Sequence, residues 1–228
     1  MSFFYFCDII NYGDDMASAL IHISVAKEAN KILQKNEKEF ILGSIAPDIA
    51  KQIGKKKKDT HFINGDNNVP DLEAFLLKYK DSLDNSFNLG YYCHLFTDFL
   101  WYGFYVLKYQ IGETLYYRDG HSKEMPFDEV ISEVYQEYTN LNIKLIERYN
   151  LDLSLFYEEA PIIKSNIEEI PIDNIKIIID QMGIIIENSE KKENVLYDIN
   201  SIDEFVQFTV KAFIKHLKEI KILWHILK

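Results

Sequence analysis

A long apolar stretch that contains two ionisable residues most limits the folds open to this chain. The segment GYYCHLFTDFLWYGFY, residues 90–105, is almost entirely apolar and aromatic, yet it holds His94 and Asp98 four positions apart. Its length and hydropathy predict a buried helix from about Ser86 to Tyr109. Residues four apart lie on the same face of a helix, so both side chains can reach one ion. Because an ionised carboxylate costs several kcal/mol to bury alone, the pair indicates either a metal site or a His–Asp hydrogen bond in the core.

Helical spacing of apolar residues continues through most of the chain and predicts an all-α fold. The segment IPIDNIKIIIDQMGIIIE is rich in β-branched residues and is compatible with a strand, but its isoleucines fit helical spacing better. Turn-forming residues predict that 43–70 and 110–126 are irregular. The expected helices are at about 18–33, 70–79, 126–149 and 172–186, with a last one that opens on a capping box from Ser201 to Glu204 and carries an apolar stripe to Trp224 and Leu227.

The N-terminal segment and the composition of the sequence indicate what class of protein this is. Met16 opens a natural helix start, so we expect residues 1–15 to be an N-terminal extension that need not belong to the fold, and 16–228 to form one domain. A formal net charge of −11 argues against a basic surface for duplex nucleic acid. Cys7 and Cys93 are too few for a disulfide framework. With no signal peptide or membrane span visible, we expect a cytoplasmic protein.

Three further residues extend the His94–Asp98 pair. His22 lies on the apolar face of its predicted helix, Asp48 follows Pro47, and His61 lies in a turn-rich loop. Histidine and carboxylate ligands from separated segments suit zinc or a similar divalent ion. A single histidine on an apolar face is usually a core residue, but two such histidines with a buried carboxylate are harder to explain in that way. His216 and His225, beside the apolar stripe of the last helix, are expected to be surface residues without a functional role.

Four motifs in order resemble the bacterial zinc-dependent phospholipase C family, which is related to the single-strand-specific zinc nucleases. They are IHISVAKEA, GSIAPD, K-x-x-THF and GYYCHLFTD, and they span about residues 16–105. The resemblance implies a mostly α-helical bundle around a zinc cluster and hydrolysis of phosphodiester bonds. It also implies that Asp48, His61, His94 and Asp98 make one zinc site, and that His22 binds a neighbouring metal with Asp98 as a bridge.

The chain departs from the family pattern at several positions. The secreted enzymes use a mature N-terminal amino group as a ligand, and this sequence shows no leader to remove. They also supply more histidines after the His-x-x-x-Asp pair, whereas the position eight after His94 is Tyr102. His121 has Glu124 three residues later rather than four, so His121 is a second-site ligand, a substrate-contacting residue or an ordinary loop residue. We therefore expect one or two ions, zinc or another divalent metal, rather than three.

The expected function is metal-dependent hydrolysis of a phosphodiester or phospholipid. A bound divalent cation lowers the pKa of its water to about 7, which provides hydroxide at neutral pH. Asp48 and Asp98 are the candidate catalytic residues, because they can orient the water as well as bind the metal. Lys55 to Lys58 form either a solvated loop or a site that attracts an anionic substrate or lipid head group. Peripheral membrane contact is compatible with this function, and the oligomeric state is not indicated.

The alternative is a catalytically weak metal- or ligand-binding protein that keeps the phospholipase C-like fold. A catalytic metal keeps an open coordination position that faces a cleft, whereas a structural metal is fully ligated by protein. The geometry of the site therefore bears directly on the choice between the two functions.

Overall fold

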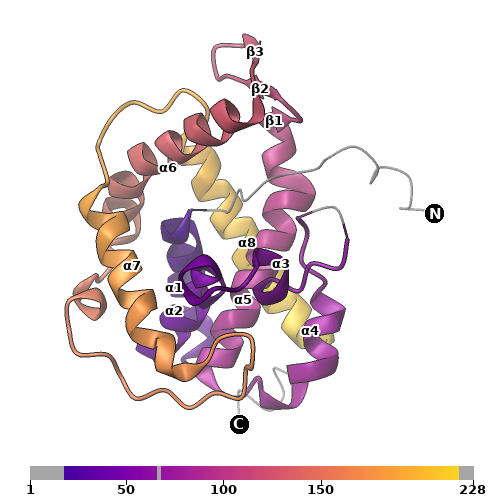
Figure 1. Ribbon diagram of the computed structural model, residues 1–228, viewed down its shortest axis with the longest axis vertical. Coiled ribbons are helices and arrows are strands. Elements are labelled where there is room, and N and C mark those ends of the chain that lie inside the picture. The colour runs from indigo at the N-terminus through magenta and orange to yellow at the C-terminus, as the bar shows by residue number, and fades with distance from the viewer. Residues whose placement is uncertain (1–17, 66–67, 221–228) are drawn as a thin grey trace.

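The computed structural model describes residues 18–65 and 68–220 (Figure 1). The expectations for residues 1–15, Cys7, Trp224, His225 and Leu227 lie outside these ranges. No helix in the described part of the chain is long and apolar enough to cross a membrane.

The all-α prediction is confirmed, because α-helices make up most of the described chain and the strands form one small sheet. The helices are α1 (Ala19–Leu33), α2 (Glu37–Ile45), α3 (Lys57–Thr60), α4 (Leu72–Tyr79), α5 (Ser86–Leu100), α6 (Phe127–Tyr149), α7 (Ile175–Glu187) and α8 (Ile199–Glu219). The strands are β1 (Gln110–Ile111), β2 (Thr114–Tyr116) and β3 (Ser122–Glu124), paired antiparallel in the order β1-β2-β3. This small sheet replaces the loop expected at 110–126.

Polar side chains at the N-terminal ends explain where five of these helices begin. Each one accepts a hydrogen bond from a backbone N–H of the first turn, which would otherwise lack an intrahelical partner. Four of these side chains lie within one residue of the start of a predicted helix or just before α2. The fifth side chain corrects a prediction. The cap of α8 is Asp198, which accepts a hydrogen bond from the backbone N–H of Ser201, so Ser201 lies inside the helix rather than at its cap. The capping side chains are those of Ser18, Asn36, Asp71, Asn85 and Asp198.

The helix that carries His94 and Asp98 is the central element. Figure 1 shows α1, α2 and α5 in the middle of the molecule, with α6 and α7 along one side and α4 on the other. Nearly every side chain of α5 is buried, as its apolar sequence predicts. Its α-helical hydrogen bonds end at Leu100, and the chain continues through a π-helical turn, Trp101–Tyr105, and a short 3-10 turn, Val106–Lys108. The predicted helix to about Tyr109 is therefore confirmed in extent, with a change of helix type after Leu100.

Two glycines let α2 and α5 approach closely. A Cβ atom on Gly43 would overlap the carbonyl oxygen of Phe87, and one on Gly90 would overlap the carbonyl oxygen of Phe40. Both obstacles are backbone atoms of the facing helix, so neither can rotate away. This contact also sets the distance between the backbone of α2 and the side chain of His94 on α5.

We expect Gly90→Ala to destabilise the fold by about 3 kcal/mol, because the added methyl group must push the two helices apart. The matched control is Gly183→Ala, in α7, where a Cβ would meet no atom within 4 Å. That change should be neutral or should stabilise the protein by up to about 1 kcal/mol, because alanine favours helix. Urea unfolding of both variants measures the difference, and equal midpoints would contradict the role assigned to the glycine contact.

Candidate metal centre

Three histidines and two aspartates from four separate segments meet in the interior. His22 comes from α1, Asp48 from the 3-10 turn Ala46–Ile49 after α2, His61 from the end of α3, and His94 and Asp98 from α5. We call these five residues the histidine–aspartate cluster. The histidines and Asp98 are fully buried, whereas the side chain of Asp48 is 14% exposed. All five residues singled out in the sequence are therefore brought together.

Four potential donor atoms of the cluster lie close together. The His61 Nε2 atom is 3.1 Å from His94 Nε2, 3.3 Å from Asp48 Oδ1 and 3.6 Å from Asp98 Oδ2. The His94 Nε2 atom is 3.4 Å from each of the same two carboxylate oxygens. Zinc ligands lie about 2.0–2.1 Å from the ion, so neighbouring corners of a tetrahedral site are about 3.3 Å apart. These five distances are close to that value, as the distances between ligands of one zinc ion would be.

Backbone carbonyls fix which ring nitrogens face the centre. The Nδ1 atom of His94 is 2.8 Å from the carbonyl oxygen of Ser44, and that of His61 is 3.1 Å from the carbonyl oxygen of Lys57. A carbonyl can only accept, so both Nδ1 atoms carry the hydrogen, and the neutral rings then present a lone pair at each Nε2. Two lone pairs 3.1 Å apart repel unless a proton or a cation lies between them. The arrangement of the rings thus favours a bound cation.

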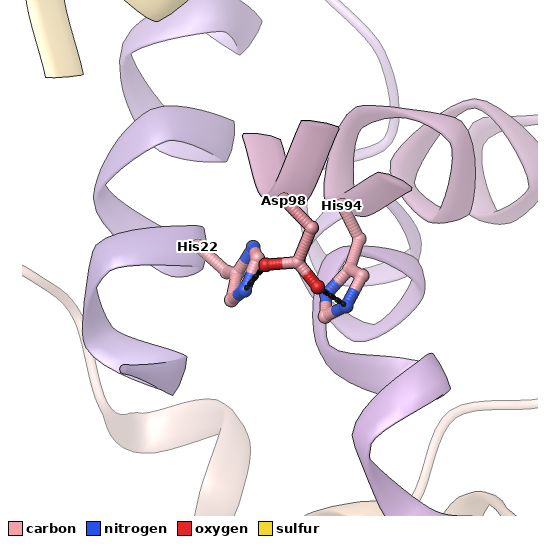
Figure 2. A group of neighbouring side chains, drawn as sticks. All are labelled: His22, His94 and Asp98. Atoms are coloured by element: carbon pink, nitrogen blue, oxygen red, sulfur yellow. Dashed lines mark ion pairs between the residues drawn. The ribbon is translucent and has the colours of Figure 1, made fainter. Parts of the chain in front are cut away.

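The Asp98 carboxylate connects this group to His22. Figure 2 shows the carboxylate between the rings of His22 and His94, with one oxygen directed toward each ring. The Oδ1 atom is 3.3 Å from His22 Nε2, while Oδ2 faces His94 and His61. The His22 and His94 rings stack with centroids 3.8 Å apart. Asp98 is therefore placed to contribute one oxygen to each of two neighbouring sites.

The protonation of the cluster leaves a negative charge that a cation would balance. Burial alone would raise the pKa of Asp98, but the charges of His22 and His94 hold that pKa well below its usual value. Burial also opposes ionisation of Asp48, and His94 again lowers the pKa. Burial lowers the pKa of His22 and of His61, which favours neutral rings, whereas the two carboxylates overcome burial and raise the pKa of His94.

Two carboxylates and one imidazolium carry one uncompensated negative charge, while a divalent cation with three neutral imidazoles balances both carboxylates. Several polar atoms of the cluster also lack a hydrogen-bond partner among the described residues. They are both ring nitrogens of His22, Oδ1 of Asp48 and both carboxylate oxygens of Asp98. Buried polar atoms normally have partners, so this set fits residues built to hold an ion.

Two side chains outside the cluster, which the sequence did not indicate, hold its loops in place. The Thr60 hydroxyl donates to the carbonyl oxygen of Pro47 at 2.9 Å and thereby ties the His61 segment to the Asp48 turn. The Tyr91 hydroxyl, from α5, donates to the Thr60 carbonyl oxygen. Such partners orient the ligands of metal sites. Backbone carbonyls have no residue signature, so those of Ser44 and Lys57 left no signal in the sequence.

His121 is not brought to the cluster. It lies between β2 and β3, where its ring stacks on Tyr117 and its Nδ1 atom is 2.5 Å from Asp119 Oδ1. The ring is exposed, and His121 belongs to neither group of potential ligands found in the described chain. These contacts are those of an ordinary loop residue.

His216 differs from the expected surface residue, because its Nε2 atom is 2.6 Å from the Tyr92 hydroxyl and its ring packs against Phe96. It is half-buried, and burial lowers its pKa. The apolar spacing of α8 placed His216 beside the stripe but gave no indication of this contact with α5. Tyr102, at the position where a further histidine was considered, is buried, and its hydroxyl is 3.2 Å from the Lys57 ammonium.

A cavity of about 910 Å³ opens beside the cluster, and Asp48 and His61 form part of its wall. Ser18, which caps the helix that carries His22, also lines it. Its lining includes lysines from the segment 51–58 and apolar residues of α7. A ligand in the cavity can therefore contact the cluster, a basic wall and an apolar wall.

A family model described as zinc-dependent phospholipase C matches residues 16–164. The matched segment covers more than half of the chain and contains all five residues of the cluster. No curated protein and no solved structure is significantly similar to the chain.

Proposed function

Because the chain belongs to the zinc-dependent phospholipase C family, we propose that it is a zinc-dependent hydrolase of phosphodiester bonds that acts on phospholipids. One observation carries this proposal: the Nε2 atoms of His61 and His94 lie 3.1 Å apart and within 3.6 Å of carboxylate oxygens of Asp48 and Asp98, beside a large cavity. The family match supplies the substrate class, and the cluster supplies residues that suit zinc.

We propose that these four residues hold one ion and that His22 and Asp98 Oδ1 hold a second. The first set offers four donors, which complete a tetrahedral zinc site. The second offers two, so an ion there keeps coordination positions that these residues do not fill. Zinc, when bound, acts as a Lewis acid toward the phosphoryl group and lowers the pKa of water.

The residues of the chain supply position and charge for this reaction. The Ser44 and Lys57 carbonyls keep the His94 and His61 rings oriented, so the site needs little rearrangement when substrate enters. Asp48 is the partly exposed member of the cluster, which places it nearest the incoming phosphodiester. The buried position of Asp98 keeps solvent from its carboxylate and strengthens its interactions with the histidines.

The alternative is a metal-binding protein with little or no catalysis, and one feature favours it. Four protein donors already complete a tetrahedral site, which is typical of structural zinc. The two proposals differ in the ion at His22: an enzyme needs an open position there, whereas a structural site needs only the first ion. The number of bound ions and the presence of hydrolysis therefore discriminate between them.

We expect the purified protein to bind two equivalents of zinc and to hydrolyse phospholipid only when loaded. A chelator should remove both zinc and activity, and added zinc should restore them, because the cluster offers no other group suited to activate water. Elemental analysis and release of diacylglycerol measure the two quantities. Absence of bound metal after incubation with zinc would refute the proposal, and zinc binding without hydrolysis of phospholipids or other phosphodiesters would favour the alternative.

A further inference from the structure

Lysine residues gather on one wall of the cavity beside the histidine–aspartate cluster. Lys51 and Lys55 to Lys58 all line it, in a chain whose formal net charge is −11. Among the described residues of the lining, Asp48 is the single carboxylate. A concave surface lined by one sign of charge concentrates ligands of the opposite sign. The cavity is therefore a basic site on an acidic protein.

Contacts with neutral groups hold two of these lysines in place. The Lys55 ammonium donates to the carbonyl oxygens of Glu168 and Glu169, at 3.1 and 2.7 Å. The Lys57 ammonium is 3.2 Å from the Tyr102 hydroxyl and 4.7 Å from the centroid of its ring. The two carbonyl groups orient the Lys55 ammonium without neutralising its charge. Lys56 and Lys58, on either side of Lys57, are exposed to solvent.

Another part of the cavity wall is apolar. It is formed by apolar side chains of α7 and of the segment from α2 to the Asp48 turn, and Ile184 on this wall is 53% exposed. An exposed isoleucine at a cavity suits contact with a hydrocarbon chain, because burial of apolar area is favourable. The apolar residues of this wall are Ile45, Ile49, Ile178, Met182, Ile184 and Ile185.

We propose that the cavity selects phospholipids with an anionic head group, such as phosphatidylglycerol, over zwitterionic choline lipids. The head group lies against the lysine wall, the phosphodiester faces Asp48 and His61, and an acyl chain lies along α7. The proposal rests on the proposed function and specifies its substrate. In the reaction, the hydroxyl of water bonds to phosphorus, the bond from phosphorus to the diacylglycerol oxygen breaks, and that oxygen takes the proton. The products are diacylglycerol and the phosphomonoester of the head group.

The test compares dibutyroyl phosphatidylglycerol with dibutyroyl phosphatidylcholine, both as monomers, so that attraction to a charged membrane surface plays no part. With zinc-loaded protein at low ionic strength, we expect kcat/KM to be about tenfold higher for the anionic lipid. Added salt should reduce the preference, because it screens the lysine charges. Equal kcat/KM for the two lipids would overturn the proposal and leave the proposed function standing.

A pair of double variants assigns the preference to the lysine wall. Lys56→Gln with Lys58→Gln should abolish most of the preference, whereas Lys211→Gln with Lys218→Gln, on the exposed face of α8, should retain it. Both pairs change the net charge equally, and all four lysines are exposed, so folding should be unaffected and circular dichroism checks this. An equal loss of preference in both pairs would overturn the assignment.

The selectivity of the cavity can also be tested if the protein proves not to hydrolyse phospholipids. If neither lipid is hydrolysed, the same two monomeric lipids are titrated into zinc-loaded protein in a calorimeter. Tighter binding of the anionic lipid would support the selectivity of the cavity, and equal binding or none would overturn it.

Discussion

Replacing His94 with alanine is expected to remove most of the stabilisation that zinc gives to the fold. A ligand that binds only the native state stabilises it by about 4 kcal/mol at a thousandfold excess over its dissociation constant. For a chain of this size, that corresponds to a rise of about 10 °C in the melting temperature of the wild type. His94 is one of the four proposed ligands of the first ion, and its Nε2 atom lies 3.4 Å from an oxygen of each carboxylate, so its loss should weaken zinc binding strongly.

Thermal unfolding with and without zinc measures this effect. The difference between the two melting temperatures is the relevant quantity, because His94→Ala also leaves a cavity and unbalanced carboxylates that destabilise the metal-free protein. His121→Ala is the matched control, since its ring is exposed on the small sheet and it belongs to neither group of potential ligands in the described chain. That variant should retain the full response to zinc.

His216 is unsuitable as a neutral control, although its sequence position predicts a surface residue. Its contacts with Tyr92 and Phe96 mean that His216→Ala should lower the melting temperature with or without zinc. An undiminished zinc response in His94→Ala would contradict the assignment of His94 as a ligand.

The helices and the cluster could be predicted because each depends on local pattern. The helices expected from the sequence included α1, α4, α5, α6, α7 and α8, and a carboxylate and a histidine inside the apolar segment of α5 drew attention to the centre. Such groups are costly to bury, so their presence in a core helix carries information about what they meet. The remaining members of the cluster, His22, Asp48 and His61, followed from residue type and from family resemblance.

Features that depend on contacts between distant segments could not be predicted. The cap of α8 is Asp198 rather than Ser201, whose hydroxyl instead bonds to those of Tyr105 and Tyr109 at 2.8 Å. The buried carboxylate of Glu137 accepts hydrogen bonds from the backbone N–H groups of Leu196 and Tyr197, at 2.9 and 3.1 Å. On its own helix, Glu137 has no sequence signal that separates it from the exposed acidic residues around it.

The geometry also bears on the number of metal ions that Asp98 could help to bind. The sequence leaves open whether Asp98 is a metal ligand or only a hydrogen-bond partner of His94. In the structure, the open question is whether one ion or two would bind beside Asp98. Asp98 has histidines on both sides of its carboxylate, so the first ion and a second one would share it. In the proposed function, catalysis would then depend on whether an ion beside His22 keeps an open coordination position. Asp48 and His61 are the members of the cluster that line the cavity.

Asp48→Asn is expected to lower kcat/KM for phospholipid hydrolysis by about 10³-fold, equivalent to about 4 kcal/mol of barrier, while the helical fold remains intact. Asparagine keeps the shape of the side chain but removes the charge that would help to hold the proposed cation beside His61 and His94. Its amide also offers hydrogens where lone pairs must face an ion. The residue lies in a 3-10 turn at the cavity rather than in α5, so the substitution opens no large void.

The measurement is turnover of phospholipid, with zinc content by equilibrium dialysis and circular dichroism on the same sample. The matched control is Asp119→Asn, which removes the same charge from an exposed carboxylate on the small sheet. Reduced zinc content with reduced turnover would place the effect in metal binding. Normal zinc content with reduced turnover would place it at the substrate, because Asp48 is the partly exposed member of the cluster. Full turnover in a folded Asp48→Asn protein would exclude Asp48 as a required residue and move the site of hydrolysis away from the cavity wall.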